Sequence, residues 1–476
     1  MQQQAVQRYR AGQLWQANGW QADIGLGVDA AGRLTEVAPE GGQTLGAWVL
    51  PGMPNLHSHA FQRAMAGLAE RKGVTHALGA EREDQQAADR GGMAQPTDSF
   101  WTWRETMYAF AAKIGPEQLQ AIAAQLYVEM LKSGYTQVCE FHYLHHQPDG
   151  TPYAQPEAMS LALIEAAREA GIGLTLLPVL YMSGGFDGRP LAPRQRRFGH
   201  DVSAYLRLLQ ALRAQQNDHV RLGIALHSLR AVPEQAMRSL LATGESKDLP
   251  IHIHIAEQIG EVQDCLAVRG ARPVEWLLDH AQVDARWCLV HATHLSGHEA
   301  SRLARSGAVA GLCPTTEANL GDGLFPLADY LDAGGTLGIG SDSHISISPV
   351  EELRWLEYGQ RLQTRHRNIA SRCAGDSVGE TLWRAALRGG AQAAGLPIGE
   401  LRAGARADLI VLDESSPLLA ARDQRSVLDS FLFAGNTPLV RDVMCGGDWV
   451  VRGFRHRDEE RIAARYRRVV DELAKY

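Results

Sequence analysis

Eight short apolar segments, separated by longer and more polar stretches, run through the middle of this chain. Such segments, rich in Val, Ile, Leu and Ala, are typical of parallel strands that are buried on both faces. They are residues 48–56, 136–141, 174–180, 220–226, 250–255, 287–291, 308–312 and 336–340. Helical spacing of apolar residues fills several of the intervals, at 116–133, 157–170, 202–215 and 233–241. This alternation predicts an α/β fold, a TIM-like (β/α)8 barrel; a doubly wound sheet is the alternative.

The two ends of the chain differ from the middle, because short β-rich segments alternate there with glycine turns. These segments are 12–17, 25–28, 34–37 and 47–50 at one end, and 407–413, 439–445 and 448–451 at the other. We therefore expect a small β-sandwich domain built from both chain ends. The predicted units are residues 1–50 and 403–455 for the small domain, 51–402 for the barrel, and 456–476 for a C-terminal helix.

Residues 67–99 interrupt the alternation with a polar, weakly patterned sequence that contains several glycines. A stretch of this length without periodicity is typical of a long loop. Because it follows the first predicted barrel strand, we expect it to be a mobile loop or lid over the mouth of the barrel.

Histidines and acidic residues follow four of the predicted strands at their carboxyl ends. Active sites of (β/α)8 barrels are built at this face, so four such coincidences favour a single site. Within it, two imidazoles in the sequence H-x-H can meet one ion, because residues i and i+2 of an extended segment share a face. The residues concerned are His57, His59, His254, Glu257, His291 and Asp342. We interpret His252, His294 and His344, in the same segments, as structural or supporting residues.

This arrangement resembles the amidohydrolase superfamily: H-x-H after strand one, H-x-x-E after strand five, His after strand six and Ser-Asp after strand eight. The resemblance covers nearly the whole chain, including the split β domain and the segment ADLIVLD at 407–413. It implies that a divalent metal ion is bound, with Glu257, His291 and Asp342 as catalytic residues. The ligands that it implies are His57, His59, His254 and Asp342.

Three neutral imidazoles and one carboxylate suit Zn²⁺, with Fe²⁺ as the alternative, and leave a position for water. Members of the superfamily that hold two ions resemble one another in a carboxylated lysine on the fourth strand. The predicted fourth strand and its extension, residues 220–230, contain no lysine. We therefore expect one metal ion per chain.

Two arginines and a tyrosine near predicted strand ends favour a small acidic substrate, because guanidinium groups bind carboxylates in a bidentate fork. The segments around them resemble the formimidoylglutamate deiminase family, which releases ammonia from N-formimino-L-glutamate and leaves N-formyl-L-glutamate in histidine degradation. The resemblance implies substrate contacts by Gln62, Arg104, Tyr143, His227 and Arg230. The alternatives are a deaminase of guanine or of an adenosine derivative such as S-adenosylhomocysteine, and a non-catalytic, metal-binding scaffold.

Charge and cysteine content constrain the partners. The formal net charge of −7 argues against a broad nucleic-acid surface, and no apolar run is long enough to span a bilayer. The six cysteines are scattered without a C-x-x-C motif, and the first residues lack the apolar region of a secretory signal, so we expect a cytoplasmic protein. The family resemblance suggests a homodimer.

Overall fold

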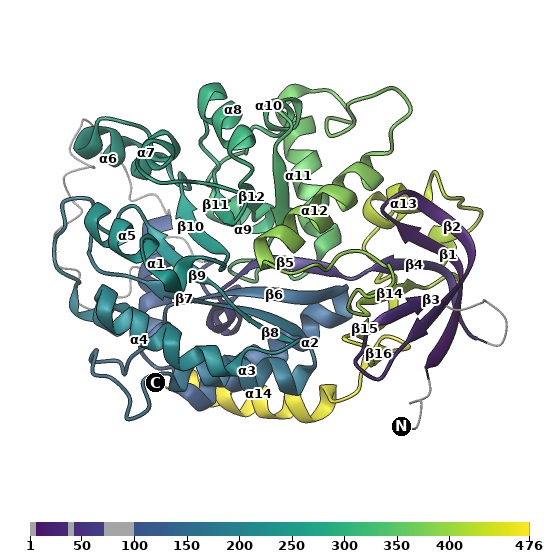
Figure 1. Ribbon diagram of the computed structural model, residues 1–476, viewed down its shortest axis with the longest axis horizontal. Coiled ribbons are helices and arrows are strands. Elements are labelled where there is room, and N and C mark those ends of the chain that lie inside the picture. The colour runs from purple at the N-terminus through teal and green to yellow at the C-terminus, as the bar shows by residue number, and fades with distance from the viewer. Residues whose placement is uncertain (1–5, 37–41, 71–99, 476) are drawn as a thin grey trace.

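The computed structural model describes residues 6–36, 42–70 and 100–475 (Figure 1). Its larger unit is a parallel barrel sheet in the order β5-β6-β7-β9-β10-β11-β12-β13, with β8 paired to β7. Its strands are β5 (Met53–Ser58), β6 (Tyr135–His142), β7 (Gly173–Leu180), β8 (Val220–Leu222), β9 (Ile224–Ser228), β10 (Ile251–Ile255), β11 (Trp287–His291), β12 (Val309–Leu312) and β13 (Thr336–Ile339). The predicted (β/α)8 barrel is confirmed.

The barrel closes between its first and last strands at the place where two predicted metal ligands lie. A parallel bridge joins Ser58 to Asp342. The Asp342 N–H donates to the His57 carbonyl at 3.0 Å, and the His59 N–H donates to the Asp342 carbonyl at 3.1 Å. A Cβ at Gly340 would lie 2.7 Å from the His57 Cβ, so this approach requires glycine. Closure of the barrel therefore fixes the H-x-H segment against the last strand end.

Two predicted strands are each divided by a glycine, so the prediction of one continuous strand at 48–56 and at 220–226 was wrong. At Gly52 the chain leaves β4 (Gln43–Pro51) of the second sheet and enters β5 of the barrel. At Gly223 it passes from β8 to β9. A Cβ at Gly52 would lie 2.3 Å from the Thr136 side chain, and one at Gly223 would lie 2.5 Å from Leu177. Apolar character is continuous through both glycines, which is why the sequence pattern did not reveal the divisions.

The predicted helices surround the barrel. Four correspond to α2 (Pro116–Ser133), α3 (Ala158–Ala170), α4 (Val202–Leu212) and α5 (Glu234–Leu241). The predicted helix 202–215 ends early, and its last residues form the 3-10 helix η4 (Arg213–Gln215). The remaining helices are α1 (Phe100–Ala111), α6 (Ile259–Arg269), α7 (Pro273–His280), α8 (Gly297–Ser306), α9 (Pro314–Leu320), α10 (Leu327–Asp332), α11 (Pro349–Thr364), α12 (Val378–Ala394), α13 (Val427–Phe433), α14 (Glu459–Leu473) and the 3-10 helices η1 (Ala60–Met65), η3 (Pro193–Phe198), η5 (Gly244–Ser246) and η6 (Pro417–Leu419).

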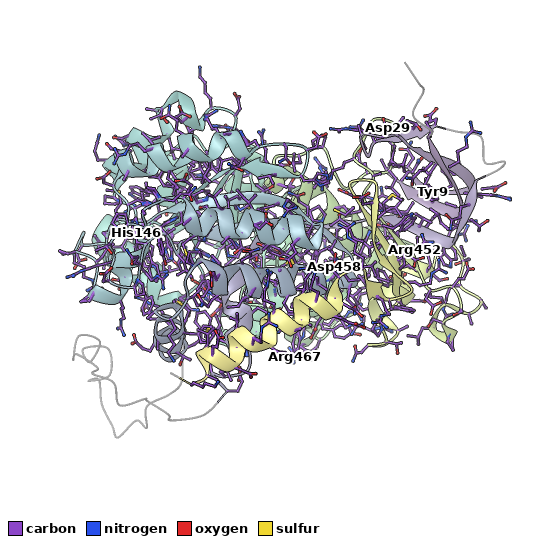
Figure 2. The ribbon with its side chains drawn as sticks, turned by 90° about the horizontal axis from the view of Figure 1, so that it is seen from below. Tyr9, Asp29, His146, Arg452, Asp458 and Arg467 are labelled. Atoms are coloured by element: carbon purple, nitrogen blue, oxygen red, sulfur yellow. The ribbon has the colours of Figure 1, made fainter. Side chains whose placement is uncertain are left out.

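The second sheet contains strands from both chain ends, which confirms the predicted small β domain. Its order is β17-β16-β15-β14-β4-β1-β2-β3, with β4 parallel to β1 and antiparallel to β14. Figure 2 places Tyr9 and Arg452, from opposite ends of the sequence, in this one unit. The sheet is strongly curved. The turn between β2 and β3 reaches the turn between β15 and β16, where Gly32 lies against the backbone of Gly446. Besides β4, its strands are β1 (Gln7–Gln16), β2 (Gly19–Val28), β3 (Leu34–Glu36), β14 (Leu409–Leu412), β15 (Val440–Cys445), β16 (Asp448–Arg452) and β17 (Arg455–His456).

Alternate side chains of β14 pack into two different hydrophobic cores. Ile410 and Leu412 belong to the large apolar cluster of the barrel, whereas Leu409 and Val411 belong to a separate cluster inside the small domain. This alternation follows from the period-two geometry of a strand. The small domain is thereby joined to the barrel by a continuous apolar contact.

The C-terminal helix α14 lies along α2 of the barrel, with Arg467 on its length (Figure 2). Lys132 on α2 pairs with Glu459 at 2.8 Å. Of the segment 67–99, residues 71–99 lie outside the described residues, so the prediction of a mobile lid stays a prediction. No helix in residues 6–36, 42–70 or 100–475 is long and apolar enough to cross a membrane.

Candidate active site and metal centre

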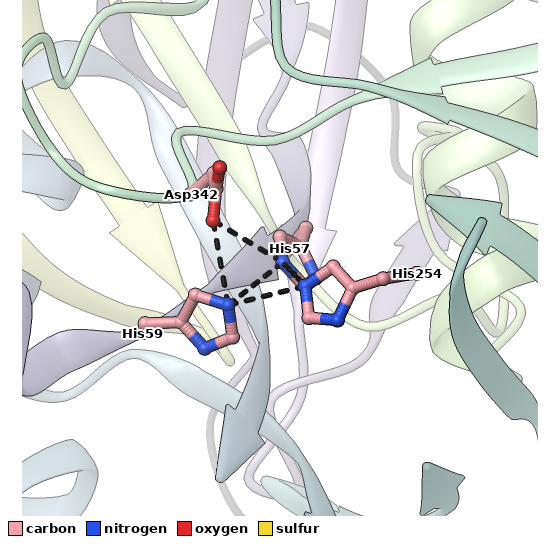
Figure 3. A group of neighbouring side chains, drawn as sticks. All are labelled: His57, His59, His254 and Asp342. Atoms are coloured by element: carbon pink, nitrogen blue, oxygen red, sulfur yellow. Dashed lines mark hydrogen bonds and ion pairs between the residues drawn. The ribbon is translucent and has the colours of Figure 1, made fainter. Parts of the chain in front are cut away.

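Four ligand atoms from three strand ends converge at the closure of the barrel (Figure 3). The Nε2 atoms of His57, His59 and His254 lie 3.0–3.3 Å from one another. The Asp342 Oδ1 lies 3.3 Å from the His57 Nε2 and 3.4 Å from the His59 Nε2. Ligands placed about 2.0–2.1 Å from a tetrahedral Zn²⁺ would be about 3.3–3.4 Å apart. The spacing of these four atoms therefore fits a divalent ion.

The protonation of the imidazoles also fits a cation. His59 Nδ1 lies 2.8 Å from the Phe141 carbonyl and His254 Nδ1 lies 3.0 Å from the His227 carbonyl. A carbonyl only accepts, so each Nδ1 carries the hydrogen and each Nε2 presents a lone pair to the site. Burial, followed by the neighbouring imidazoles, lowers the pKa of His57 and His254 well below the usual range, and burial lowers the pKa of His59. The lone pairs on the Nε2 atoms of neutral imidazoles repel one another at this distance, and a cation bound between them removes that repulsion.

The backbone at these strand ends is strained. His291 and Asp342 have φ angles of 68° and 45°, in the left-handed region that side chains with a Cβ rarely adopt. Ala256 and Ala292, each beside a site residue, have φ angles of 51° and 50°. Such conformations are retained where a site requires a particular side-chain direction.

Glu257 and His291 form a buried pair beside the ligands. Glu257 Oε1 lies 3.7 Å from His291 Nε2, which is 4.0 Å from Asp342 Oδ2. Burial raises the pKa of Glu257 to about 7, although His291 opposes this. Burial lowers the pKa of His291, but the carboxylates of Glu257, Glu317 and Asp342 outweigh it and raise that pKa to about 10. The site thus combines a carboxyl group that can exchange a proton at neutral pH with an imidazolium that can donate a hydrogen bond.

A cavity that opens to solvent lies over the ligands. The structure brings all five predicted substrate-contact residues into its wall together with five of the predicted metal and catalytic residues. These are Gln62, Arg104, Tyr143, His227 and Arg230, and His59, His254, Glu257, His291 and Asp342. These residues lie between positions 59 and 342 of the sequence, so it is the folding of the barrel that brings them together.

A profile of the amidohydrolase family matches residues 48–450 of the chain. The chain belongs to the amidohydrolase family. A formimidoylglutamate deiminase of Pseudomonas aeruginosa is 55% identical over 461 residues, which is 96% of this chain and 97% of that protein. The crystal structure of an amidohydrolase from Brucella melitensis has a TM-score of 0.88 at 43% identity, covering 98% of this chain and 100% of that one. A zinc-bound adenosine deaminase from Xanthomonas campestris shares the fold at 20% identity, with a TM-score of 0.77 and 98% of each chain covered.

Within the cavity of this amidohydrolase, the predicted contact residues have different surroundings. Gln62 Nε2 donates to the Tyr143 hydroxyl at 3.1 Å, and Gln62 Oε1 is buried without a hydrogen-bond partner among the described residues. Arg104 Nε donates to the Tyr108 hydroxyl at 2.8 Å. The His227 ring lies 4.3 Å from the Tyr181 ring, and the His227 backbone carbonyl accepts a hydrogen bond from His254, a predicted metal ligand.

One buried carboxylate that the sequence analysis did not single out supports the ligand loop of the amidohydrolase. Glu140, on β6, accepts hydrogen bonds from the Ser58 hydroxyl at 2.5 Å, the Ala60 N–H at 2.7 Å and the Tyr127 hydroxyl at 3.2 Å. Burial raises the pKa of Glu140 to about 7. A charged residue at the end of an otherwise apolar strand was the available signal. Its contacts hold the H-x-H segment in place.

The three histidines interpreted as structural have contacts that agree with that interpretation. His344 lies between the Ser58 and Ser341 hydroxyls, at 3.1 and 3.0 Å. His252 Nε2 lies 2.8 Å from the Ala393 carbonyl on α12, and His294 is half-buried outside the ligand cluster.

The sequence analysis missed cavity residues that follow strand three and a carboxylate that follows strand seven. Tyr181 and Ser183 come directly after β7 and line the cavity. Glu317, on α9, lies 3.3 Å from His291 Nδ1 and accepts from the Cys313 N–H at 2.9 Å. Their positions just past predicted strands were a usable signal, but none of the three stands in a histidine-rich motif.

Proposed function

We propose that this amidohydrolase hydrolyses N-formimino-L-glutamate to N-formyl-L-glutamate and ammonia, a reaction of L-histidine degradation. The observation that carries the proposal is the single cavity that combines the four-ligand cluster, the Glu257–His291 pair and the guanidinium groups of Arg104 and Arg230. A linear substrate with two carboxylates matches two guanidinium groups. The 55% identity to a formimidoylglutamate deiminase supports the same substrate.

The proposed cofactor is one Zn²⁺ per chain, held by His57, His59, His254 and Asp342. When bound, the ion supplies a Lewis acid that lowers the pKa of water and polarises the substrate. The nitrogen-rich donor set supports zinc, as does the zinc-bound neighbour in fold.

A second group of side chains, His291, Cys313 and Glu317, is also compact enough to hold an ion. We propose that it does not. Glu317 Oε1 is already used by the Cys313 N–H and by His291 Nδ1.

Glu257 is the proposed proton carrier. The water oxygen bonds to the formimino carbon, while Glu257 takes one proton from the water and delivers it to the terminal nitrogen. A second proton then passes from the new hydroxyl group to that nitrogen, the carbon–nitrogen bond breaks, and ammonia leaves a formyl group behind. A carboxyl pKa of about 7 allows Glu257 to accept and release a proton at neutral pH.

His291 is the proposed electrostatic partner of this step. Its Nδ1 donates to Glu317, so the Nε2 hydrogen is directed to the side of Glu257 and Asp342. The surrounding carboxylates raise the pKa of His291, which favours its protonated form. Its Nε2–H can then stabilise negative charge that develops on the attacking oxygen.

Ammonia release tests the proposed function directly. We expect the zinc-loaded protein to turn over N-formimino-L-glutamate at least about a thousandfold more efficiently, in kcat/KM, than guanine or S-adenosylhomocysteine, since a site built for ionic contacts rejects ligands that leave them unpaired. Greater efficiency on either purine would replace the proposed substrate with the alternative deaminase activity. Tight zinc binding without ammonia release from any of the three would favour the non-catalytic scaffold.

Replacing Arg104 or Arg230 with methionine should lower kcat/KM for N-formimino-L-glutamate by about ten- to over a hundredfold, without loss of zinc. Each substitution removes a charge-assisted bond worth about 1.5–3 kcal/mol. Arg194→Met is the matched control, because Arg194 lies as close to the Tyr108 ring as Arg104 does, at 5.1 Å, but does not line the cavity. Full activity in both Arg104→Met and Arg230→Met would remove the two arginines from substrate binding.

The cytoplasmic location and the homodimer are also proposals. The homodimer rests on the family resemblance, and the cytoplasmic location rests on the six scattered cysteines, which are typical of a reducing compartment. The domain boundaries at 50/51, 402/403 and 455/456 are proposed on the same footing. Light scattering of the purified protein tests the dimer.

A further inference from the structure

We propose that Gln195, which lies behind the cavity wall, is a positioning residue: it makes the Tyr108 and Tyr181 hydroxyl oxygens accept on its side, which leaves a phenol hydrogen to donate to a substrate carboxylate. Both tyrosines line the cavity, whereas Gln195 does not and is 4% exposed. The inference rests on the proposed function, because it assigns these residues to the recognition of an acidic substrate.

The orientation of the Gln195 amide is fixed by its backbone neighbour. Gln195 lies on η3, and its Oε1 accepts the Ala192 N–H at 2.9 Å. A backbone N–H can only donate, so the other amide atom, Nε2, must face the tyrosines. It lies 3.2 Å from the Tyr108 hydroxyl oxygen and 3.1 Å from the Tyr181 hydroxyl oxygen.

A count of hydrogens decides what the two hydroxyl groups can do. The Gln195 nitrogen carries two hydrogens and no lone pair to offer, so both phenol oxygens accept from it. The Tyr108 oxygen also accepts from Arg104 Nε at 2.8 Å. Each phenol still has one hydrogen of its own. If the two hydroxyls share one of these hydrogens between them, the other remains for a group in the cavity.

The charge around these hydroxyls favours an anion as that group. Among the described residues that line the cavity, the acidic ones are Glu257 and Asp342, which belong to the metal and catalytic cluster. Arg104 and Arg230 supply positive charge to the same wall, and Arg230 Nε is buried without a hydrogen-bond partner in the described chain. Burial raises the pKa of Tyr181, so its hydroxyl stays protonated at neutral pH.

A carboxylate suits this wall better than a neutral group does. It only accepts hydrogen bonds, and its two oxygens can receive a guanidinium fork and a hydroxyl at once. The three rings of Tyr108, Tyr143 and Tyr181 pack around Phe198, with centroid distances of 5.1–5.9 Å, so the hydroxyl positions are held by packing. Gln195 thus acts through the tyrosines and does not touch the substrate.

The substitution Gln195→Glu tests this with a change of one atom. The new side chain can still accept the Ala192 N–H, but it replaces the donor behind the phenols with an acceptor. The phenol hydrogens would then turn away from the cavity. We expect KM for N-formimino-L-glutamate to rise about tenfold or more while kcat changes by less than about threefold. Zinc content should not change.

Tyr181→Phe should also raise KM, because it removes one of the two phenol hydroxyls.

Substrates that lack one carboxylate separate a binding role from a structural one. N-formimino-2-aminobutyrate lacks the side-chain carboxylate, and 4-formiminoaminobutyrate lacks the α-carboxylate. We expect the KM penalty of Gln195→Glu to disappear on one of these two compounds and to persist on the other. An equal penalty on all three substrates would overturn the proposal, because it would indicate general damage to the fold. Tyr205→Phe is the matched control, since it removes a buried hydroxyl that donates to the Pro178 carbonyl outside the cavity wall.

Calorimetry with glutarate distinguishes this inference from the proposed function. Suppose that the wild-type protein does not release ammonia from N-formimino-L-glutamate but binds glutarate, and that Gln195→Glu weakens this binding about tenfold. The role of Gln195 in carboxylate binding is then confirmed and the proposed reaction is wrong. If the wild-type protein is active and the variant binds glutarate and substrate as well as the wild type does, the reaction stands and Gln195 has no such role. If the wild-type protein neither turns over the substrate nor binds glutarate, both are overturned.

Discussion

Replacing His254 with alanine is expected to remove the metal and the activity together. The wild-type protein should bind one equivalent of zinc per chain, and the variant should retain less than about a tenth of an equivalent after dialysis. The physical reason is that the three remaining donors lose the closed four-ligand geometry, in which the His254 Nε2 lies 3.0–3.3 Å from the Nε2 atoms of His57 and His59. Activity should fall by at least about a thousandfold, because water activation depends on the ion. Elemental analysis and ammonia release measure the two effects.

His252→Ala is the matched control for this variant. His252 lies two residues earlier on β10 and is also buried, but its Nε2 contacts the Ala393 carbonyl and it is not part of the ligand cluster. It should keep its zinc while losing some thermal stability, since a buried hydrogen bond is removed. Two equivalents of zinc in the wild-type active site, or one in His254→Ala, would contradict the proposed single four-ligand site.

The site was predictable from the sequence where its residues are concentrated in short motifs at strand ends. His57 and His59 lie two residues apart at one strand end, and Glu257 follows His254 by three residues at another. Because a parallel barrel brings all carboxyl strand ends to one face, such motifs meet without detailed knowledge of packing. The same argument correctly placed Arg230, which follows the fourth barrel strand in the chain and lines the cavity.

Residues whose environment depends on the approach of distant chain segments could not be predicted in this way. Gln195 lies on η3, between β7 and α4, and nothing local to it indicates that its amide contacts Tyr108, 87 residues earlier. Gly52 and Gly223 divide apolar runs because of what a Cβ would contact in another strand, which a linear pattern does not contain. Patterns with a period therefore identify elements, whereas the limits of those elements depend on tertiary contacts.

Replacing Glu257 with glutamine is expected to abolish catalysis while the metal stays bound. The substitution keeps the shape of the side chain and touches no ligand of the cluster, but an amide cannot accept and deliver a proton. We expect kcat and kcat/KM to fall together by at least about a hundredfold, because the lost interaction belongs to the transition state. Zinc content and binding of a substrate analogue should be within about threefold of wild type.

The control for this last variant is Glu261→Gln, at a second buried carboxyl group close to the first. Glu261 accepts the Glu257 N–H at 3.2 Å, and a glutamine oxygen can still accept it, so the Glu257 backbone keeps its position. Glu261 does not line the cavity, and its variant should retain activity within a few fold of wild type. Loss of activity in Glu257→Gln but not in Glu261→Gln would therefore assign the effect to proton transfer at one carboxyl group. Normal turnover by Glu257→Gln would show that the proton is carried by another group, and Asp342, 4.0 Å from His291, would be the next to examine.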